Sequence, residues 1–137
     1  ANPPRYMGKA YVPSSVERVS RPADCEQNAR LIRFAEVLLM NAEAAYHTGG
    51  DAATPLNRVR ARADLDPIGD PSLEDIWLER RLELAGEQDR FWDVVRQGRG
   101  PDVFGRYGFV EGKHELYPIP QAEIDLSGGL LEQNPGW

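Results

Sequence analysis

The sequence is poor in residues that bind metals or form covalent cross-links. Its 137 residues include one cysteine, Cys25, and two histidines, His47 and His114. A single cysteine excludes both an internal disulfide and a zinc site built from several cysteines. His47 follows Glu43 by four residues, but two ligands do not make a metal site, and a histidine at this position is typical of a helix C-terminus. We therefore expect no metal and no cofactor in this chain.

Long apolar runs and a surplus of basic residues are missing as well. No segment approaches the roughly 20 apolar residues that span a bilayer, and the opening ANPPRYMGKAYVP lacks the basic and then apolar order of a signal peptide. Either the protein is not exported, or this chain begins after its export signal. A net charge of −6 argues against nucleic acid or an anionic membrane surface as a partner, because both favour clustered Lys and Arg.

The third absence is a catalytic constellation. No glycine-rich phosphate loop follows a strand pattern, and no serine lies in a nucleophile-elbow context. Cys25 has no histidine nearby in the sequence, so we interpret it as an incidental thiol. We predict that the chain has no catalytic residues and is not an enzyme.

One set of carboxylates needs a separate interpretation. Glu79, Glu83 and Glu87 recur every four residues and would share one face of a helix, where paired carboxylates can perform acid–base chemistry or bind metal. A helix that holds a di-metal centre also needs a Glu-x-x-His motif, which neither histidine provides. We favour structural ion pairs with neighbouring arginines; these are Arg80, Arg81 and Arg90.

What is present is the pattern of one helical domain over residues 1–137. Residues 1–27 contain four prolines and are predicted to be an irregular lead-in, followed by a three-helix core over residues 28–98. Asn28 is available as the cap of the first helix, and Gly49-Gly50 ends it. Its broad apolar face predicts burial; the face comprises Leu31, Ala35, Leu38, Ala42 and Ala45, widened by Ile32, Leu39 and Tyr46.

The second and third helices follow the same reasoning. The second is expected to begin at Asp51 or Thr54 and to turn Leu56, Val59 and Ala63 inward. Helix, Gly-Gly turn and helix form a hairpin of the kind that stacks in helical-repeat proteins. The third helix is predicted to be the longest, capped by Ser72 with Asp75 and continuous to Gly98.

Residues 99–137 are predicted to be a loop with aromatic anchors and a docking tail. The tail carries seven large apolar side chains between Tyr117 and Trp137, too many to leave in water. We expect Tyr117 and Ile119 to pack on the third helix or on the first hairpin. Asn134-Pro135-Gly136 fits a type II turn with Pro and Gly at its central positions.

Four segments, in this order, resemble the C-terminal part of the SusD/RagB family, which are nutrient-binding surface lipoproteins of the Bacteroidetes outer membrane. They are LIRFAEVLLMNAEAAY, LNRVRARA, IWLERRLELAGEQDRFWDVVRQG, and YPIPQAEI with LEQNPGW. The resemblance implies an all-α, TPR-like helical-repeat domain with extended N- and C-terminal segments.

The resemblance also implies a function. Family members bind glycans or other nutrients at the cell outer membrane, without catalysis, as partners of a TonB-dependent, SusC-like transporter. They are much longer than this chain, and their signal peptide, lipid-bearing cysteine and most sugar contacts lie in an N-terminal part. We therefore expect a C-terminal portion whose only link to the membrane is a lipid anchor absent from this chain. The alternative is a TPR-type module that holds a protein or peptide.

Aromatic side chains are the usual contacts of sugar rings. Trp77 and Trp92 occupy core-facing positions of the predicted third helix, so packing is favoured for both. Tyr107, in the FGRYGF loop, is the one candidate ligand contact that the sequence offers. Between the two roles, the sequence favours a structural anchor for Tyr107 over a ligand contact.

Overall fold

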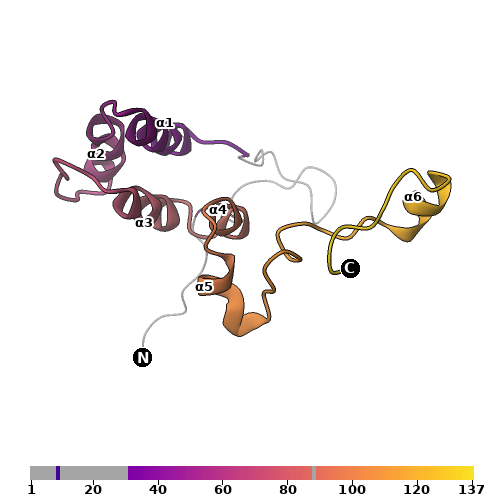
Figure 1. The fold of residues 1–137 in the computed structure, drawn as a ribbon. Coiled ribbons are helices and arrows are strands. Elements are labelled where there is room, and N and C mark those ends of the chain that lie inside the picture. The colour runs from indigo at the N-terminus through magenta and orange to yellow at the C-terminus, as the bar shows by residue number, and fades with distance from the viewer. Residues whose placement is uncertain (1–8, 10–30, 88) are drawn as a thin grey trace, which may run out of the picture. The chain divides into compact units, whose positions relative to one another are not determined.

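The computed structural model describes residue 9, residues 31–87 and residues 89–137, and it divides the chain into two compact units, Ala1–Gly86 and Glu87–Trp137. The described residues contain helices and no strand, which confirms the all-α prediction (Figure 1). None of the helices in this part of the chain has the length and apolar character needed to span a bilayer. The single domain expected over residues 1–137 stays a prediction.

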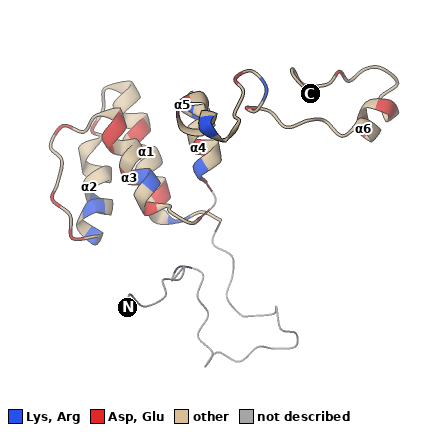
Figure 2. Cartoon of the chain, turned by 90° about the horizontal axis from the view of Figure 1, so that it is seen from below, with Lys and Arg blue, Asp and Glu red and all other residues tan. Residues whose placement is uncertain are grey.

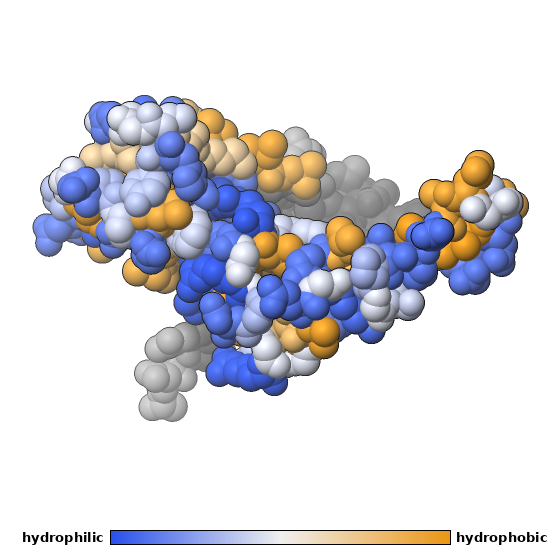
Figure 3. Space-filling view, viewed as in Figure 1, coloured by the Kyte–Doolittle hydropathy of each residue, from blue (hydrophilic) through white to orange (hydrophobic). Residues whose placement is uncertain are grey.

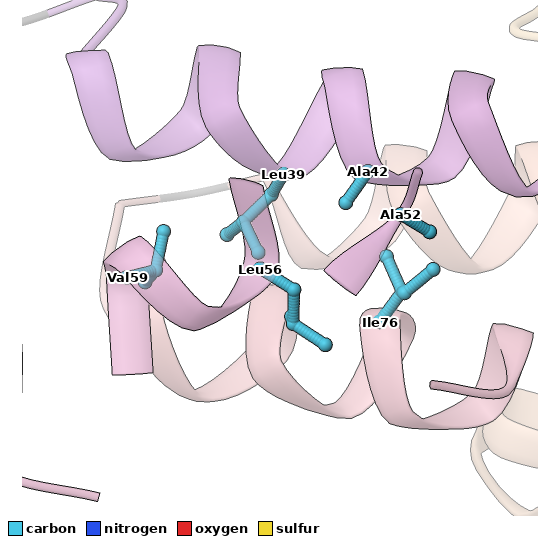
Figure 4. Close-up of a cluster of buried hydrophobic side chains, with 6 residues drawn as sticks. All are labelled: Leu39, Ala42, Ala52, Leu56, Val59 and Ile76. Atoms are coloured by element: carbon cyan, nitrogen blue, oxygen red, sulfur yellow. The ribbon is translucent and has the colours of Figure 1, made fainter. Parts of the chain in front are cut away.

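Three helices build the first unit: α1 (Phe34–Thr48), α2 (Ala53–Arg62) and α3 (Leu73–Glu83). Their inward faces meet in a small core whose large members are almost completely excluded from solvent (Figure 4). The core residues are Leu39, Ala42, Ala52, Leu56, Val59 and Ile76. All six side chains are aliphatic, and five of them lie within the helices while Ala52 directly precedes α2, so packing here depends on close approach of the helices.

Local signals determine where these helices begin and end. Gly49 adopts a left-handed φ of 71° and ends α1, and the Asp51 side chain accepts a hydrogen bond from the Thr54 N–H at the start of α2. Ser72 and Asp75 form the predicted capping box at α3. The Asn57 side chain bonds both the N–H and the C=O of Ile68, which ties the connecting loop to α2.

Two predictions about the hairpin were wrong. The first helix begins at Phe34 rather than near residue 28, because Arg33 has an extended backbone, and Leu31 and Ile32 are exposed. Asn28 lies outside the described residues. Ala63 is exposed rather than inward-facing, because α2 ends at Arg62 and the chain then turns away through a left-handed conformation at Asp64.

The prediction of a long third helix was also wrong, and so was the prediction of a three-helix core over residues 28–98. α3 ends at Glu83, and a separate helix, α4 (Arg90–Arg96), belongs to the second unit. Gly86 is responsible for the break, because its φ of 80° lies in the left-handed region that no helix interior adopts. The apolar stripe continues across Gly86 in the sequence, but the helical conformation of the backbone is interrupted there.

The second unit is built from short helices and extended chain. After α4 come α5 (Gly100–Phe104), the 3-10 helix η2 (Gly105–Tyr107) and α6 (Gln121–Leu126). The segment on either side of α6 is the tail that the sequence singled out. Figure 3 shows hydrophobic surface around α6, where Leu126 and Leu130 are 81% and 88% exposed.

Candidate functional site

The glutamates of α3 form ion pairs with other parts of the first unit. Glu79 Oε2 lies 2.7 Å from Arg60 Nη1 of α2. Glu83 pairs with Arg33 at 2.9 Å and with Arg62 at 2.6 Å. Both carboxylates are buried. They form ion pairs as predicted, but these pairs are with arginines of neighbouring segments, which the prediction of Arg80, Arg81 and Arg90 did not include.

A second buried pair joins α1 to α3. Arg80 Nη2 donates to Glu36 Oε1 at 2.9 Å, with both side chains almost fully buried. Trp77 Nε1 donates to Glu43 Oε1 at 3.0 Å, so the Glu43 carboxylate has a structural role as an acceptor. Figure 2 shows acidic residues on α1, basic residues on α2 and both kinds on α3. Within the described residues, no three His, Cys, Asp or Glu side chains could hold a metal ion.

The second unit gathers aromatic side chains from several segments. The Phe91 ring of α4 lies 5.9 Å from Phe104 in a stacked arrangement and 5.2 Å from Trp92 edge to face. Tyr117 of the tail lies 6.5 Å from Phe91 and 5.8 Å from Trp92. These centroid distances are in the range of favourable aromatic pairs. The cluster therefore takes the place of a large aliphatic core in this unit.

A close approach of Gly100 to Phe109 holds one edge of this aromatic cluster. A Cβ atom on Gly100 would lie 2.4 Å from the Phe109 ring, which is far inside van der Waals contact. Phe109 also lies 6.4 Å from Phe104 and 5.6 Å from the His114 ring. Glycine at position 100 thus allows the ring to rest on the first turn of α5.

The aromatic cluster surrounds a cavity of about 340 Å³ that opens to solvent. Its wall is mainly apolar and aromatic; the lining residues are Phe91, Phe104, Tyr107, Gly108, Phe109, His114, Leu116, Tyr117 and Trp137. Tyr107 is 72% exposed, and the Arg106 guanidinium lies 4.7 Å from the centre of its ring. An exposed aromatic face beside a donor-rich cation can hold a ligand with one apolar face and several hydroxyl groups.

Trp137 is another lining residue of this aromatic-lined cavity. Trp137 Nε1 donates to the carbonyl oxygens of Lys113 and Leu116, both at 3.1 Å. Lys113 Nζ lies 4.3 Å from the centre of the Trp137 ring. The His114 ring contacts Trp137 edge to face at 5.6 Å, and its Nδ1 accepts the Val110 N–H. Trp137 is therefore a docked residue.

Hydrogen bonds from two polar side chains join the end of the tail to its beginning. Gln133 accepts the Ile119 N–H at 2.8 Å and donates to the Ile119 carbonyl at 2.9 Å. Asn134 Nδ2 donates to the Tyr117 carbonyl at 2.6 Å. A turn follows in which the Trp137 N–H bonds the Asn134 carbonyl, with Gly136 at a φ of 81°. This is the type II geometry predicted for Asn-Pro-Gly.

The docking prediction holds for part of the tail. Tyr117 packs on α4, which lies within the segment predicted as the third helix. Leu126 and Leu130 are largely exposed instead. The packing expected of Ile119 stays a prediction.

Tyr107, the candidate that the sequence offered, lines this cavity, and its contact with a ligand stays a prediction; the residues around it were not anticipated. Trp92 was assigned to the core, yet it is 54% exposed. The prediction for Trp92 assumed one continuous helix. A separate helix, α4, begins at Arg90 instead, and this changes the face on which each following side chain lies. The spacing of Phe91, Phe104 and Phe109 along the sequence carries no signal of their meeting, since short turns bring them together.

The resolved pKa shifts belong to helix starts of the first unit. The pKa of Asp75 is lowered by hydrogen bonds from the Ser72 side chain and backbone. The pKa of Asp51 is lowered by the Thr54 side chain and then by the Thr54 backbone. Both shifts reflect capping, in which the carboxylate is the favoured acceptor.

Comparison with known proteins gives a consistent result. The model of the SusD family matches residues 5–137. SusD-like protein P2 of Formosa agariphila is 34% identical over 127 residues, which cover 77% of this chain and 25% of that protein. The chain thus spans about a quarter of this curated relative.

Solved structures agree in sequence and in fold. A laminarin-binding SusD-like protein is 44% identical, with a TM-score of 0.69 over 77% of this chain and 22% of its own. Surface glycan-binding protein A from Bacteroides thetaiotaomicron, in complex with laminarihexaose, is 37% identical, with a TM-score of 0.70 over 81% of this chain and 26% of its own. The TPR-like helical architecture expected from the sequence is thereby confirmed.

Proposed function

Because the chain belongs to the SusD family, we propose that it is part of a non-catalytic surface protein that binds a glycan. One observation supports this most directly: the chain is 37% identical, at a TM-score of 0.70, to a surface glycan-binding protein in complex with laminarihexaose. That similarity covers 81% of this chain but 26% of the neighbour. Glycan binding by the whole protein is therefore a proposal.

Within this chain, we propose the aromatic-lined cavity of the second unit as a sugar contact. The Tyr107 ring is largely exposed, and the Arg106 guanidinium, which lies over this ring, supplies N–H donors beside it. A pyranose presents C–H groups on one face and hydroxyls around its rim, which matches this combination. A cavity of about 340 Å³ lies at the small end of ligand sites, which begin near 300 Å³, and has room for one or two sugar units.

The remaining parts of the proposal concern location and partner. We propose that the protein acts at the outer surface of the cell outer membrane, anchored by lipid outside this chain, and passes its glycan to a TonB-dependent transporter. The family resemblance supports both points. Catalysis is not part of the proposal, since the buried glutamates of α3 are used in ion pairs.

Calorimetric titration of the chain with laminarihexaose and other neutral hexasaccharides tests this proposal. We expect binding to one of them that Tyr107→Ala weakens about tenfold, equivalent to roughly 1.4 kcal/mol. Tyr46→Ala is the matched control, because Tyr46 is an exposed tyrosine on α1. The glycan should be recovered at unchanged length. Equal losses in the two variants, absence of binding to every glycan, or release of shorter products would contradict the proposal.

A further inference from the structure

The first unit has a groove with an unusual lining for an acidic chain. It is a cavity of about 340 Å³ bordered by Arg33 and Phe34 at the start of α1 and by Arg58 and Arg62 of α2. Val59, fully buried, forms part of its floor. Figure 2 shows the basic residues toward the C-terminal end of α2. We refer to this cavity as the arginine groove.

Positive charge exceeds negative charge at the arginine groove. Arg33 and Arg62 share the single carboxylate of Glu83, at 2.9 and 2.6 Å. Arg58 has no ion pair with any of the described residues. Among the described residues that line the groove there are three arginines and no acidic side chain, in a chain with a net charge of −6. Guanidinium groups gathered in this way attract an anion and supply it with N–H donors.

The arginine groove also presents an aromatic face. Phe34 is 64% exposed, and the Arg58 guanidinium carbon lies 5.2 Å from the centre of its ring. This contact orients the guanidinium, whose planar N–H fork matches the two oxygens of a carboxylate. Arg62 is 64% exposed in its side chain and keeps N–H groups available to solvent. The groove therefore combines an apolar platform with donors for one planar anion.

We propose that the arginine groove binds an acidic sugar, with the ring on Phe34 and the carboxylate on Arg58 and Arg62. The choice of a sugar over an acidic peptide rests on the glycan-binding function proposed above. The carboxylate of a uronic acid lies at the edge of a ring with an apolar face, so it can meet both halves of the groove at once. This site is separate from the aromatic-lined cavity, which lacks a comparable set of arginines among its lining residues.

The test is a calorimetric titration of the chain with hexagalacturonate. We expect binding that Arg58→Ala and Phe34→Ala each weaken at least tenfold. The matched control is Arg81→Ala, which removes the same charge from an exposed position on α3 outside the arginine groove and should leave affinity unchanged. Binding should also weaken on raising the salt concentration from about 0.05 M to 0.5 M, because an exposed charge contact is screened.

Two further arms separate this proposal from the previous one. Tyr107→Ala should leave hexagalacturonate binding unchanged while it weakens binding of the neutral hexasaccharide. An equal loss in Arg81→Ala, or equal affinity for hexaglutamate, would overturn the acidic-sugar site and indicate attraction by charge alone. Absence of hexagalacturonate binding, with neutral glycan binding intact, would overturn the arginine groove alone. Loss of both would overturn the glycan-binding function as well.

Discussion

At the scale of single residues, Arg80 and Glu36 illustrate how the stability of the fold depends on a buried ion pair. Each side chain is removed from water and compensated by the other at 2.9 Å. Arg80→Ala should lower the free energy of unfolding by about 3–5 kcal/mol, because it leaves a buried carboxylate uncompensated. Urea denaturation followed by circular dichroism measures this loss.

The control for that variant is Arg62→Ala. Arg62 is 64% exposed, and its partner Glu83 keeps Arg33, so the expected loss is under about 1 kcal/mol. Replacing Arg80 and Glu36 together by Met and Leu should recover much of the stability lost in Arg80→Ala. If the single Arg80 variant lost no more than Arg62→Ala, the pair would not be buried in solution.

Gly100 offers a second test at the same scale. Gly100→Ala places a methyl group where the Phe109 ring lies, with a separation of 2.4 Å, so Phe109 has to move. We expect a loss of about 1–3 kcal/mol and a weaker neutral glycan affinity, since Phe109 lines the aromatic cavity. Gly105→Ala is the control, because nothing lies within 4 Å of its Cβ position and its backbone is already helical. Equal melting temperatures for the two variants would contradict this account.

At the scale of elements, the start of α3 depends on pH. The folded pKa of Asp75 is below its ordinary value of 3.8 because Ser72 donates to the carboxylate. The stabilisation is therefore fully present above pH 5 or so, and it is lost as the pH falls through 3.8 and below. Asp75→Asn should reduce the fall in melting temperature on acidification, measured between pH 6 and pH 3. An unchanged pH profile would show that this cap does not stabilise the fold.

The elements also show what the sequence could reveal. Caps and turns were predictable because their chemistry is local: Ser72 with Asp75, Gly49 after α1, and the Asn-Pro-Gly turn all lie where their side chains require. The break at Gly86 was not predictable, because glycine inside an apolar helical stripe is tolerated in some helices and left-handed in others. The meeting of Phe91, Phe104 and Phe109 was hidden for a related reason, since it depends on several successive turns.

At the scale of the whole molecule, the tail is part of the second unit. The Tyr117 ring contacts Phe91 and Trp92, and Trp137 lines the aromatic-lined cavity. Deleting residues 117–137 should lower the melting temperature, promote aggregation and increase binding of a hydrophobic dye, because the rings of α4 lose their cover. Differential scanning calorimetry and light scattering measure these effects.

The matched variant for this deletion is Leu126→Ser with Leu130→Ser. Both side chains are more than 80% exposed, so their replacement should leave the melting temperature unchanged and reduce aggregation. A deletion that melted at the same temperature as the full chain and stayed monomeric would show that the tail does not stabilise this unit.

The hydrogen bonds of Gln133 also determine how two backbone N–H groups of the tail become exposed to solvent. Its side-chain oxygen accepts the backbone N–H of Ile119 at 2.8 Å and that of Asn134 at 2.9 Å, so a single amide group acts as the strand partner that this segment lacks. Both hydrogens are shielded from solvent by the same acceptor, and one rotation of the Gln133 side chain exposes both. Their exchange with deuterium should therefore proceed at a common rate, set by the opening of one side chain rather than by unfolding of the unit.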